Sequence, residues 1–380
     1  MPSRLTTEDR HRFEVKNHVL SGIRLLALLR ILYRYKKHVA FLYYFHRILF
    51  LVCIATFNSL VGLLEDAIYG RVVSRVVLHP EPVFILGHPR TGTTHVHNLL
   101  SLDGRFAFAN TFQCGFPSTF LLLERFSWLL APLMDKTRPM DNMRLHFDLP
   151  QEDEIATLSL SSGVSPYLQI VFMLSFDRFE PLFAFGDDCD PADKDAWRKS
   201  FLFFLKKVTY RHGGCKPLLI KSPVHTARIR VILDMFPNAK FVYCHRCPYE
   251  VFSSSLNMAR KYYPYCYLMN PVHERDVLDF IFRQYTLLFD EYVKGRALVD
   301  SGSLVEVPFQ MLDAKPKEAV REIYARLGLP GGGDLETAVS AYLSELKGFR
   351  KNSHAPLDGE MRRLVATRWR DSFDAFGYNI

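Results

Sequence analysis

The chain lacks the signals that mark secreted and nucleic-acid-binding proteins. It contains no N-x-[ST] sequon, so nothing in the sequence supports a glycosylated luminal domain. Its long apolar run begins only at residue 48, which is too late for a cleavable signal peptide. The basic residues are spread along the chain without a recognised nucleic-acid-binding motif, so we expect no nucleic-acid partner.

Cysteine is also scarce, with seven residues scattered along 380 positions. No combination of cysteine and histidine has the spacing of a zinc site, and we expect no bound metal. Reduced, buried thiols are the simplest interpretation and favour the cytosol. The other proportions, 48% hydrophobic and 23% charged residues, are those of a globular protein. A net charge of +8 predicts an anionic partner such as a nucleotide, a sulfated product or an acidic lipid.

Residues 1–79 form a basic N-terminal region that we expect to be separate from a catalytic domain over 80–380. After Glu14 no acidic residue occurs before residue 48, and the basic residues interleave with Leu, Ile and Tyr. This pattern predicts one or two amphipathic helices. The following run, residues 48–64, has no charge over seventeen positions, the lower limit for crossing a bilayer.

The run over 48–64 has two interpretations, and the sequence leaves both open. Basic residues before it and Glu65-Asp66 after it would place the N-terminus in the cytoplasm, as in a single-pass type II membrane protein. Thr56, Asn58 and Ser59 interrupt the run and favour a helix buried against the rest of the chain. We therefore expect a cytoplasmic protein, a peripheral membrane protein or a single-pass one.

From residue 82 onward short apolar runs alternate with helical patterns. Uncharged strands bounded by turns and followed by helices indicate a parallel sheet covered on both faces. The expected fold class is therefore α/β, a P-loop-like three-layer α/β/α arrangement with a central parallel sheet, preceded by N-terminal helices. We expect strands over 82–87, 217–221, 240–246 and 304–307, and helices over 93–102, 226–236 and 316–327 and from 249 onward.

The segment Gly87-His-Pro-Arg-Thr-Gly-Thr-Thr94 lies between a predicted strand and a predicted helix. In that position loop N–H groups and the helix N-terminus form an anion site. Gly92 allows a phosphate to approach the backbone, Thr93 and Thr94 supply hydroxyls, and Arg90 supplies charge. Nucleoside triphosphatases have a lysine where Thr93 stands, so this loop suits a 5′-phosphate bound without magnesium. A P-loop-type nucleotide kinase or hydrolase remains the alternative.

A second phosphate site is predicted where the third strand ends. Arg246 stands at the carboxyl end of that strand, and Ser254 follows eight residues later in the next helix. Two phosphate sites at the carboxyl ends of parallel strands are what a 3′,5′-bisphosphate nucleotide needs.

Residues 82–102 and 217–260 resemble the nucleotide-binding segments of the sulfotransferase superfamily. The family loop P-[KR]-[ST]-G-T-[ST] is matched by Pro89-Arg-Thr-Gly-Thr-Thr94, and the family's arginine and serine by Arg246 and Ser254. Lys221-Ser-Pro-Val-His225 is similar to the K-S-P-x-H segment of the branch with an arginine in the loop.

The resemblance implies 3′-phosphoadenosine 5′-phosphosulfate as the sulfuryl donor and a hydroxyl or amine acceptor. The loop residues Arg90, Thr91, Gly92, Thr93 and Thr94 would then hold the 5′-phosphosulfate. Arg246 and Ser254 would hold the 3′-phosphate. The family also has a basic C-terminal loop over the donor, for which Arg350 and Lys351 are the candidates, although they equally suit a solvated basic turn.

Sulfuryl transfer requires a base for the acceptor proton and cations for the leaving phosphate. Lys221 and Arg90 are the candidate cations. The segment P-x-E-D-E resembles the arginine-loop branch and favours Glu152 as the base, with His146 as the alternative. The acidic cluster 152–154 could instead be a solvated helix N-terminus, where carboxylates interact favourably with the helix dipole.

Residues 106–133 and 262–267 are rich in aromatic and aliphatic side chains. They form either ordinary core or an apolar acceptor pocket. If they line a pocket, the acceptor is a small apolar molecule that is lipid-like, steroid-like or phenolic. A nonenzymatic nucleotide-binding membrane protein is the second alternative to an enzyme. The sequence predicts no oligomeric state.

Overall fold

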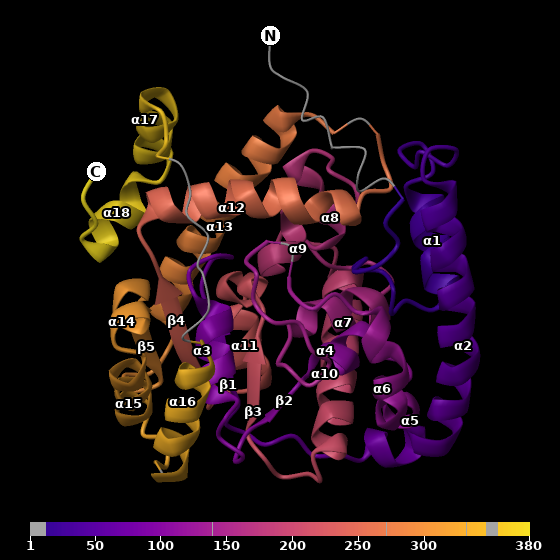
Figure 1. The fold of residues 1–380 in the computed structure, drawn as a ribbon, viewed down its shortest axis with the longest axis horizontal. Helices are drawn as coiled ribbons and strands as arrows, with labels where there is room; N and C mark the ends of the chain where they lie inside the picture. Colours follow the sequence, from indigo (N-terminus) through magenta and orange to yellow (C-terminus); the bar gives the residue numbers. More distant parts are fainter. Residues whose placement is uncertain (1–12, 139, 271, 332, 347–355) are drawn as a thin grey trace.

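The computed structural model describes residues 13–380 except 139, 271, 332 and 347–355. A five-stranded sheet occupies the centre, with helices on both of its faces and two N-terminal helices along one side (Figure 1). All strand pairs in this sheet are parallel, so the expected α/β class with a central parallel sheet is confirmed. The strand order is β2-β3-β1-β4-β5.

The four expected strands are present close to their predicted bounds. They are β1 (Val83–Leu86), β3 (Leu218–Lys221), β4 (Lys240–His245) and β5 (Leu304–Pro308). The edge strand β2 (Ala107–Phe108) was not expected. Two residues are too few to show an alternation of polar and apolar positions, which is the signal for a strand.

Alternate residues of each strand enter different cores. Phe84 and Leu86 contribute to one hydrophobic cluster and Val83 and Ile85 to another, as successive side chains of a strand must. The first cluster includes residues of α10 (Pro191–Arg211), α11 (Ile229–Met235) and α13 (Glu274–Arg296). The second includes residues of α3 (Thr93–Leu100), α14 (Phe309–Ala314), α15 (Pro316–Arg326) and α16 (Gly333–Glu345).

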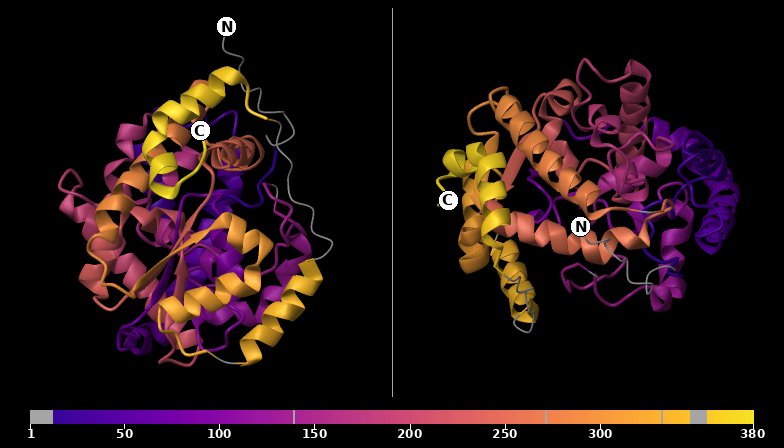
Figure 2. Two further views of the ribbon diagram at one scale, coloured as in Figure 1. Left: turned by 90° about the vertical axis from the view of Figure 1, so that its left-hand side faces the viewer. Right: turned by 90° about the horizontal axis from the view of Figure 1, so that it is seen from above.

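The N-terminal region contains α1 (Leu25–Arg34) and α2 (Phe45–Ser74), which lie side by side at the edge of the molecule (Figures 1 and 2). The apolar run 48–64 is thus part of one 30-residue helix. By length and composition α2 could cross a membrane, although core helices of soluble proteins meet the same criterion. Residues of α1 and α2 share a hydrophobic cluster with α12 (Pro248–Tyr262), α17 (Gly359–Arg368) and α18 (Arg370–Phe376).

Short helices connect these layers. They are α4 (Thr111–Gly115), α5 (Phe120–Leu123), α6 (Ser127–Leu130), α7 (Asp153–Leu160), α8 (Leu168–Val171) and α9 (Pro181–Ala184). The segment expected as one helix over 226–236 is divided into a 3₁₀ turn, η5 (Pro223–Ala227), and α11.

Two expectations about side-chain burial need correction. All seven cysteines are free, but Cys53 and Cys215 are exposed rather than buried. In the aromatic stretch 106–133, Phe112 and Phe120 belong to the core, whereas Trp128 is 67% exposed. The early part of that stretch is therefore core, and its later part lies at the surface.

Candidate functional site

The backbone of the loop between β1 and α3 has positive φ angles at three positions, Gly87, Arg90 and Gly92, a conformation that favours glycine. Gly87 has φ = +136°, and a Cβ there would lie 2.5 Å from the carbonyl oxygen of Cys244. Gly92 has φ = +99°, and its Cβ would lie 2.8 Å from the ring of Phe309. Arg90 also has a positive φ, +80°, which is uncommon for a residue with a side chain and is associated with functional loops.

Side-chain hydroxyls hold the loop in this shape and leave backbone donors at its end. The Gly87 N–H donates to Thr226 Oγ1 at 2.8 Å, and Thr91 Oγ1 donates to the His88 carbonyl at 2.8 Å. Thr93 and Thr94 are the first two residues of α3. Because the first N–H groups of a helix have no intrahelical acceptor, these threonines offer backbone as well as hydroxyl donors to an anion.

The structure brings the two predicted phosphate-binding elements together. Arg90 Nε donates to Ser254 Oγ at 3.0 Å, and Arg246 Nη1 donates to the Arg90 carbonyl at 3.4 Å. Each arginine also has an acidic partner, Asp141 for Arg90 and Glu250 for Arg246, both at 2.8 Å. Two guanidinium groups, a serine hydroxyl and the loop donors therefore surround one region, and this set of donors fits a nucleotide with two phosphate groups.

Lys221 connects this loop to the acidic segment. It ends β3, beside Ile85 of β1, and its side chain is 1% exposed. Lys221 Nζ lies 2.7 Å from Glu152 Oε1 and 3.4 Å from Thr94 Oγ1. The Tyr167 hydroxyl donates to the other Glu152 oxygen. Glu152 is 20% exposed, so its carboxylate is held firmly but can be reached.

The charge state of Glu152 is set by competing effects. Burial raises the pKa of its carboxyl group, but the Lys221 charge and the hydrogen bonds from Lys221 and Tyr167 outweigh burial, so the pKa lies below its ordinary value. Burial also lowers the pKa of Lys221, although Glu152 opposes that change. Glu152 is therefore ionised at neutral pH, as a general base must be.

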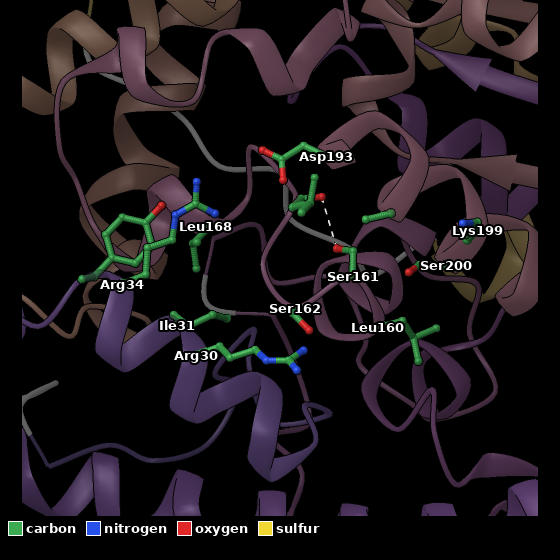
Figure 3. A pocket seen from close by; sticks show the side chains of 13 residues that line it. Arg30, Ile31, Arg34, Leu160, Ser161, Ser162, Leu168, Asp193, Lys199 and Ser200 are labelled. Carbon is green, nitrogen blue, oxygen red and sulfur yellow. Dashed lines mark hydrogen bonds between the residues drawn. The ribbon is translucent and has the colours of Figure 1, made fainter. Parts of the chain in front are cut away.

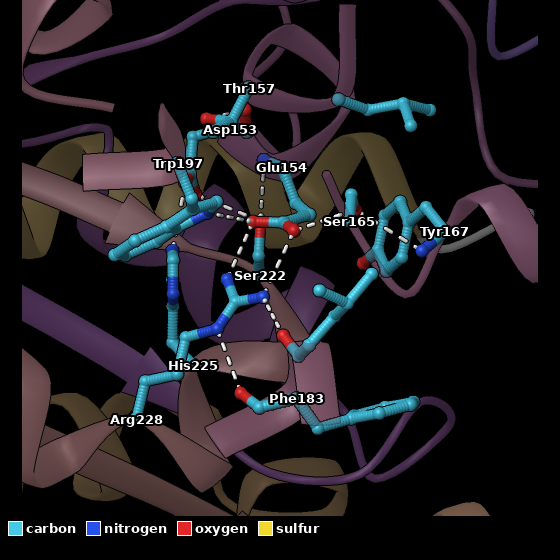
Figure 4. Close-up of polar contacts among 12 residues, drawn as sticks. Asp153, Glu154, Thr157, Ser165, Tyr167, Phe183, Trp197, Ser222, His225 and Arg228 are labelled. Carbon is cyan, nitrogen blue, oxygen red and sulfur yellow. Dashed lines mark hydrogen bonds and ion pairs between the residues drawn. The ribbon is translucent and has the colours of Figure 1, made fainter. Parts of the chain in front are cut away.

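Asp153 and Glu154 are buried in the protein interior, and Figure 4 shows their polar contacts. Glu154 accepts two hydrogen bonds from Arg228, at 2.7 and 3.1 Å, and one from Ser165 at 2.6 Å. Asp153 accepts from Ser222 at 2.8 Å and lies 2.8 Å from His225 Nε2. The interpretation of this cluster as a solvated helix N-terminus is therefore wrong, because both carboxylates are buried.

Asp153, Glu154 and His225 have ligand atoms within 4.8 Å of one another, a spacing that could hold a metal ion. The surrounding groups do not suit a cation, because both oxygens of Glu154 already face the Arg228 guanidinium. Arg228 also lies over the rings of Phe185 and Trp197, at 4.7 and 4.5 Å. We assign these residues to the scaffold that holds α7 against η5 and α10.

The remaining predicted residues are His146, Arg350 and Lys351. His146 lies in a loop, its side chain is 61% exposed, and its imidazole lies 3.2 Å from Asp148. Arg350 and Lys351 lie outside the described residues. Sequence reasoning missed Tyr167 and Asp141, because neither belongs to a motif and both approach the site only through the fold.

A hollow of about 500 Å³ lies between α1 and the segment around α7 and α10, and no residue of the loop 87–94 lines it (Figure 3). Arg30, Arg34, Lys199 and Asp193 are among its lining residues. None of the predicted site residues lines this hollow. We therefore place the candidate active site at the loop 87–94 and Lys221, and not in the hollow.

Comparison with known proteins gives consistent results. A model of the sulfotransferase family matches residues 82–332. The omega-hydroxy-beta-dihydromenaquinone-9 sulfotransferases Stf3 of Mycobacterium bovis and Mycobacterium tuberculosis are each 33% identical to this chain over 325 residues, covering 85% of this chain and 81% of the relative.

Two solved structures are similar in fold. The sulfotransferase STF1 from Mycobacterium tuberculosis H37Rv has a TM-score of 0.64 at 17% identity, covering 91% of this chain and 90% of its own. The sulfotransferase STF9 from Mycobacterium avium has a TM-score of 0.60 at 20% identity, covering 83% and 82%.

Proposed function

Because the chain belongs to the sulfotransferase family, we propose that it transfers a sulfuryl group from 3′-phosphoadenosine 5′-phosphosulfate to the hydroxyl group of a small apolar acceptor. The main support for this donor is that Arg90 contacts both Ser254 and Arg246. These contacts bring the loop after β1 and the start of α12, the two proposed phosphate-binding elements, next to each other. A nucleotide with a single phosphate group would need only one of these two phosphate-binding elements. The loop also lacks the lysine of nucleoside triphosphatases, which argues against the kinase and hydrolase alternative.

The proposed roles follow from the donors that each element offers. Arg90, Thr91, Gly92, Thr93 and Thr94 bind the 5′-phosphosulfate through side chains and loop N–H groups. Arg246 and Ser254 bind the 3′-phosphate. Arg350 and Lys351 stay candidates for a basic segment that covers the donor.

The transfer step uses the pair of Glu152 and Lys221. The acceptor oxygen attacks sulfur and forms a new S–O bond, while the bond between sulfur and the bridging phosphate oxygen breaks. The acceptor proton passes to the Glu152 carboxylate. The electron pair of the broken bond stays on the 5′-phosphate, where Lys221 and Arg90 neutralise the added charge. The second product is the 3′,5′-bisphosphate nucleotide. His146 is the less favoured base because it is exposed and beside Asp148.

The nature of the acceptor is supported by the relatives. Stf3 is named for an omega-hydroxylated menaquinone, which is a long apolar molecule with a hydroxyl group. At 33% identity over most of both chains, an apolar hydroxylated acceptor is the best-supported class for this protein as well. The seven free thiols support a reducing compartment, so the proposal places the enzyme in the cytoplasm or at its membrane surface.

Two measurements test this function. Calorimetry in the presence of a magnesium chelator should show that adenosine 3′,5′-bisphosphate binds much more tightly than adenosine monophosphate. Equal affinities would contradict the roles of Arg246 and Ser254. Incubation with ³⁵S-labelled donor and a panel of isoprenoid alcohols, hydroxylated quinones, steroids and phenols should then yield a product heavier by one sulfuryl group. A requirement for magnesium, or transfer of phosphate instead, would favour the kinase alternative.

A further inference from the structure

Helix α2 has the reverse of the polarity expected for a helix at the surface of a soluble protein. Its polar side chains Arg47, Asn58 and Glu65 point inward and are at most 1% exposed. Its outward face is mainly apolar from Phe45 to Gly70. Asp66 is the charged exception, since its side chain is 40% exposed, and it forms an ion pair with Arg24 of the N-terminal region at 2.8 Å. The residues classed as exposed are all nonpolar. These residues are Phe45, Leu49, Cys53, Phe57, Leu60, Leu63, Leu64, Ala67 and Ile68.

The exposed apolar area continues onto α1 and the turn after it. Leu26, Leu29 and Tyr33 of α1 are 62%, 47% and 72% exposed, and Leu42 before α2 is 93% exposed. Large contiguous apolar surfaces are rare on soluble monomers and mark contact sites for a membrane or another protein. We call the exposed apolar residues of α1, the turn and α2 the α1–α2 face.

The inner side of α2 is fixed to the rest of the molecule at both ends and in the middle. Arg47 Nη1 donates to the carbonyl oxygens of Pro264 and Tyr267, at 3.1 and 2.7 Å. Asn58 Nδ2 donates to the Ser21 carbonyl at 2.8 Å. Near the other end, Glu65 is buried in an ion pair with Lys207 of α10. A helix that crossed a bilayer alone would have to break these contacts and leave buried charges unpaired.

The charge around the α1–α2 face identifies what would cover it. Residues 15–64 contain no acidic residue and seven basic ones. Lys36 and Lys37 are exposed in the turn after α1, and Arg71 is exposed where the apolar side of α2 ends. Arg30 and Arg34 are also exposed and line the hollow between α1 and α10. A second copy would bring like charges together, which opposes association. A bilayer with anionic headgroups supplies both the apolar interior and the opposite charge.

We propose that the α1–α2 face docks onto an anionic lipid bilayer, with α2 lying in the plane of the interface and its inner side still attached to the protein. The helix has 30 residues and so extends over about 45 Å at ~1.5 Å per residue, which provides a long contact line. Figures 1 and 2 show α2 at the outer edge of the molecule, where a flat surface can reach it. This inference does not depend on the donor, the base or the acceptor.

Vesicle flotation tests the docking. The full-length protein should float with vesicles of phosphatidylcholine containing 30% phosphatidylglycerol and bind much less to phosphatidylcholine alone. The double variant Leu60→Glu/Leu63→Glu should reduce the bound fraction at least about tenfold, because both side chains lie on the outward face and are 66% and 63% exposed. The matched control, Val293→Glu/Leu298→Glu, changes exposed apolar residues on and after α13 and should float like the unaltered protein.

The unaltered protein gives a second measurement that does not depend on variants. Cys53 lies on the α1–α2 face and Cys215 does not, and both thiols are free and exposed. Anionic vesicles should slow the reaction of a membrane-impermeant maleimide with Cys53 and leave Cys215 unaffected. A tag at the N-terminus should stay open to added protease, since a docked helix moves neither end through the bilayer.

Several results would overturn the inference. Equal flotation of both double variants, or equal reaction of Cys53 with and without vesicles, would show that lipid does not cover the face. A protected N-terminal tag would show a spanning helix. A dimer in vesicle-free solution that only Leu60→Glu/Leu63→Glu dissociates, without flotation of either protein, would show that a second copy covers the face.

Discussion

Glu152 and Glu154 stand two residues apart, yet they occupy different regions of the molecule. Glu152 is 20% exposed and is paired with Lys221, which reaches Thr94 at the end of the loop after β1. Glu154 lies inside the protein with no exposed surface, and Arg228, Ser165 and Trp197 all donate to it. The start of α7 between them directs one carboxylate toward Lys221 and Tyr167 and the other toward Arg228.

This difference shows that an acidic motif alone does not identify a base. A general base must be ionised and must reach a proton. Glu154 is fully occupied by donors, so it has no oxygen to offer an acceptor. Glu152 is held by Lys221 and Tyr167 but retains access to solvent. Variants in the two regions should therefore have separate effects, on stability for Glu154 and on turnover for Glu152.

The largest effect on folding is expected for Glu154→Gln. The substitution keeps the shape of the side chain but leaves the buried Arg228 guanidinium without its carboxylate, and breaking a buried ion pair costs about 3–5 kcal/mol. Glu152→Gln should reduce the free energy of unfolding by only about 1–2 kcal/mol, because its side chain is partly exposed. The single carbonyl oxygen of glutamine can still accept from Lys221, and its amide NH₂ can donate to the Tyr167 hydroxyl oxygen. Urea unfolding followed by circular dichroism measures both. If both variants lost the same free energy of unfolding, Glu152 and Glu154 would not differ in their contribution to stability, which would contradict this account.

A second, smaller effect is expected at the donor site. Arg246→Ala should weaken binding of adenosine 3′,5′-bisphosphate about 10- to 100-fold, since hydrogen bonds to charged groups contribute about 1.5–3 kcal/mol. Binding of adenosine monophosphate should change little. Glu250→Ala is the matched control, because it removes the acidic partner of Arg246 without removing the guanidinium. Calorimetry that showed the same loss for both nucleotides would mean that Arg246 does not contact the 3′-phosphate.

The smallest effect is expected for Tyr167→Phe, and it appears in the pH dependence. The base acts when deprotonated, so kcat/KM falls as the pH decreases through its pKa. The pKa of Glu152 is below its ordinary value of 4.5, which places this acid limb below pH 4.5 in the unaltered enzyme. The Tyr167 hydrogen bond lowers that pKa, so its removal should move the limb to higher pH with turnover at neutral pH reduced less than about tenfold. An unchanged limb would contradict the role of Glu152 as the titrating group.

The sequence reveals the elements of the candidate site that lie within continuous motifs, and the structure brings these elements together. The loop from Gly87 to Thr94 and the spacing of Arg246 and Ser254 depend on a strand followed by a turn and a helix, which local patterns reveal. The four main strands were found for the same reason, since uncharged runs between turns are typical of buried parallel strands. The burial of Asp153 and Glu154 could not be predicted, because their partners Arg228 and His225 are more than seventy residues away in the sequence.

The N-terminal helices show a similar limit. The run 48–64 suggested either a span or a buried helix, and hydropathy alone cannot separate these alternatives. The structure shows that α2 is longer than the run and that its polar residues Arg47 and Glu65 face the protein. Which side of a helix is covered depends on its neighbours, here α1, α5 and α10, and not on its own composition.

The most direct test of the central claim is turnover of Glu152→Gln beside His146→Ala, with labelled donor at saturation and an accepted hydroxyl compound. A positioned general base contributes roughly 10²–10⁴-fold to the rate. We predict that Glu152→Gln lowers turnover at least about a hundredfold while the affinity for adenosine 3′,5′-bisphosphate changes little, and that His146→Ala has a smaller effect. Near-normal turnover of Glu152→Gln together with loss of turnover in His146→Ala would contradict the account and identify the histidine as the base.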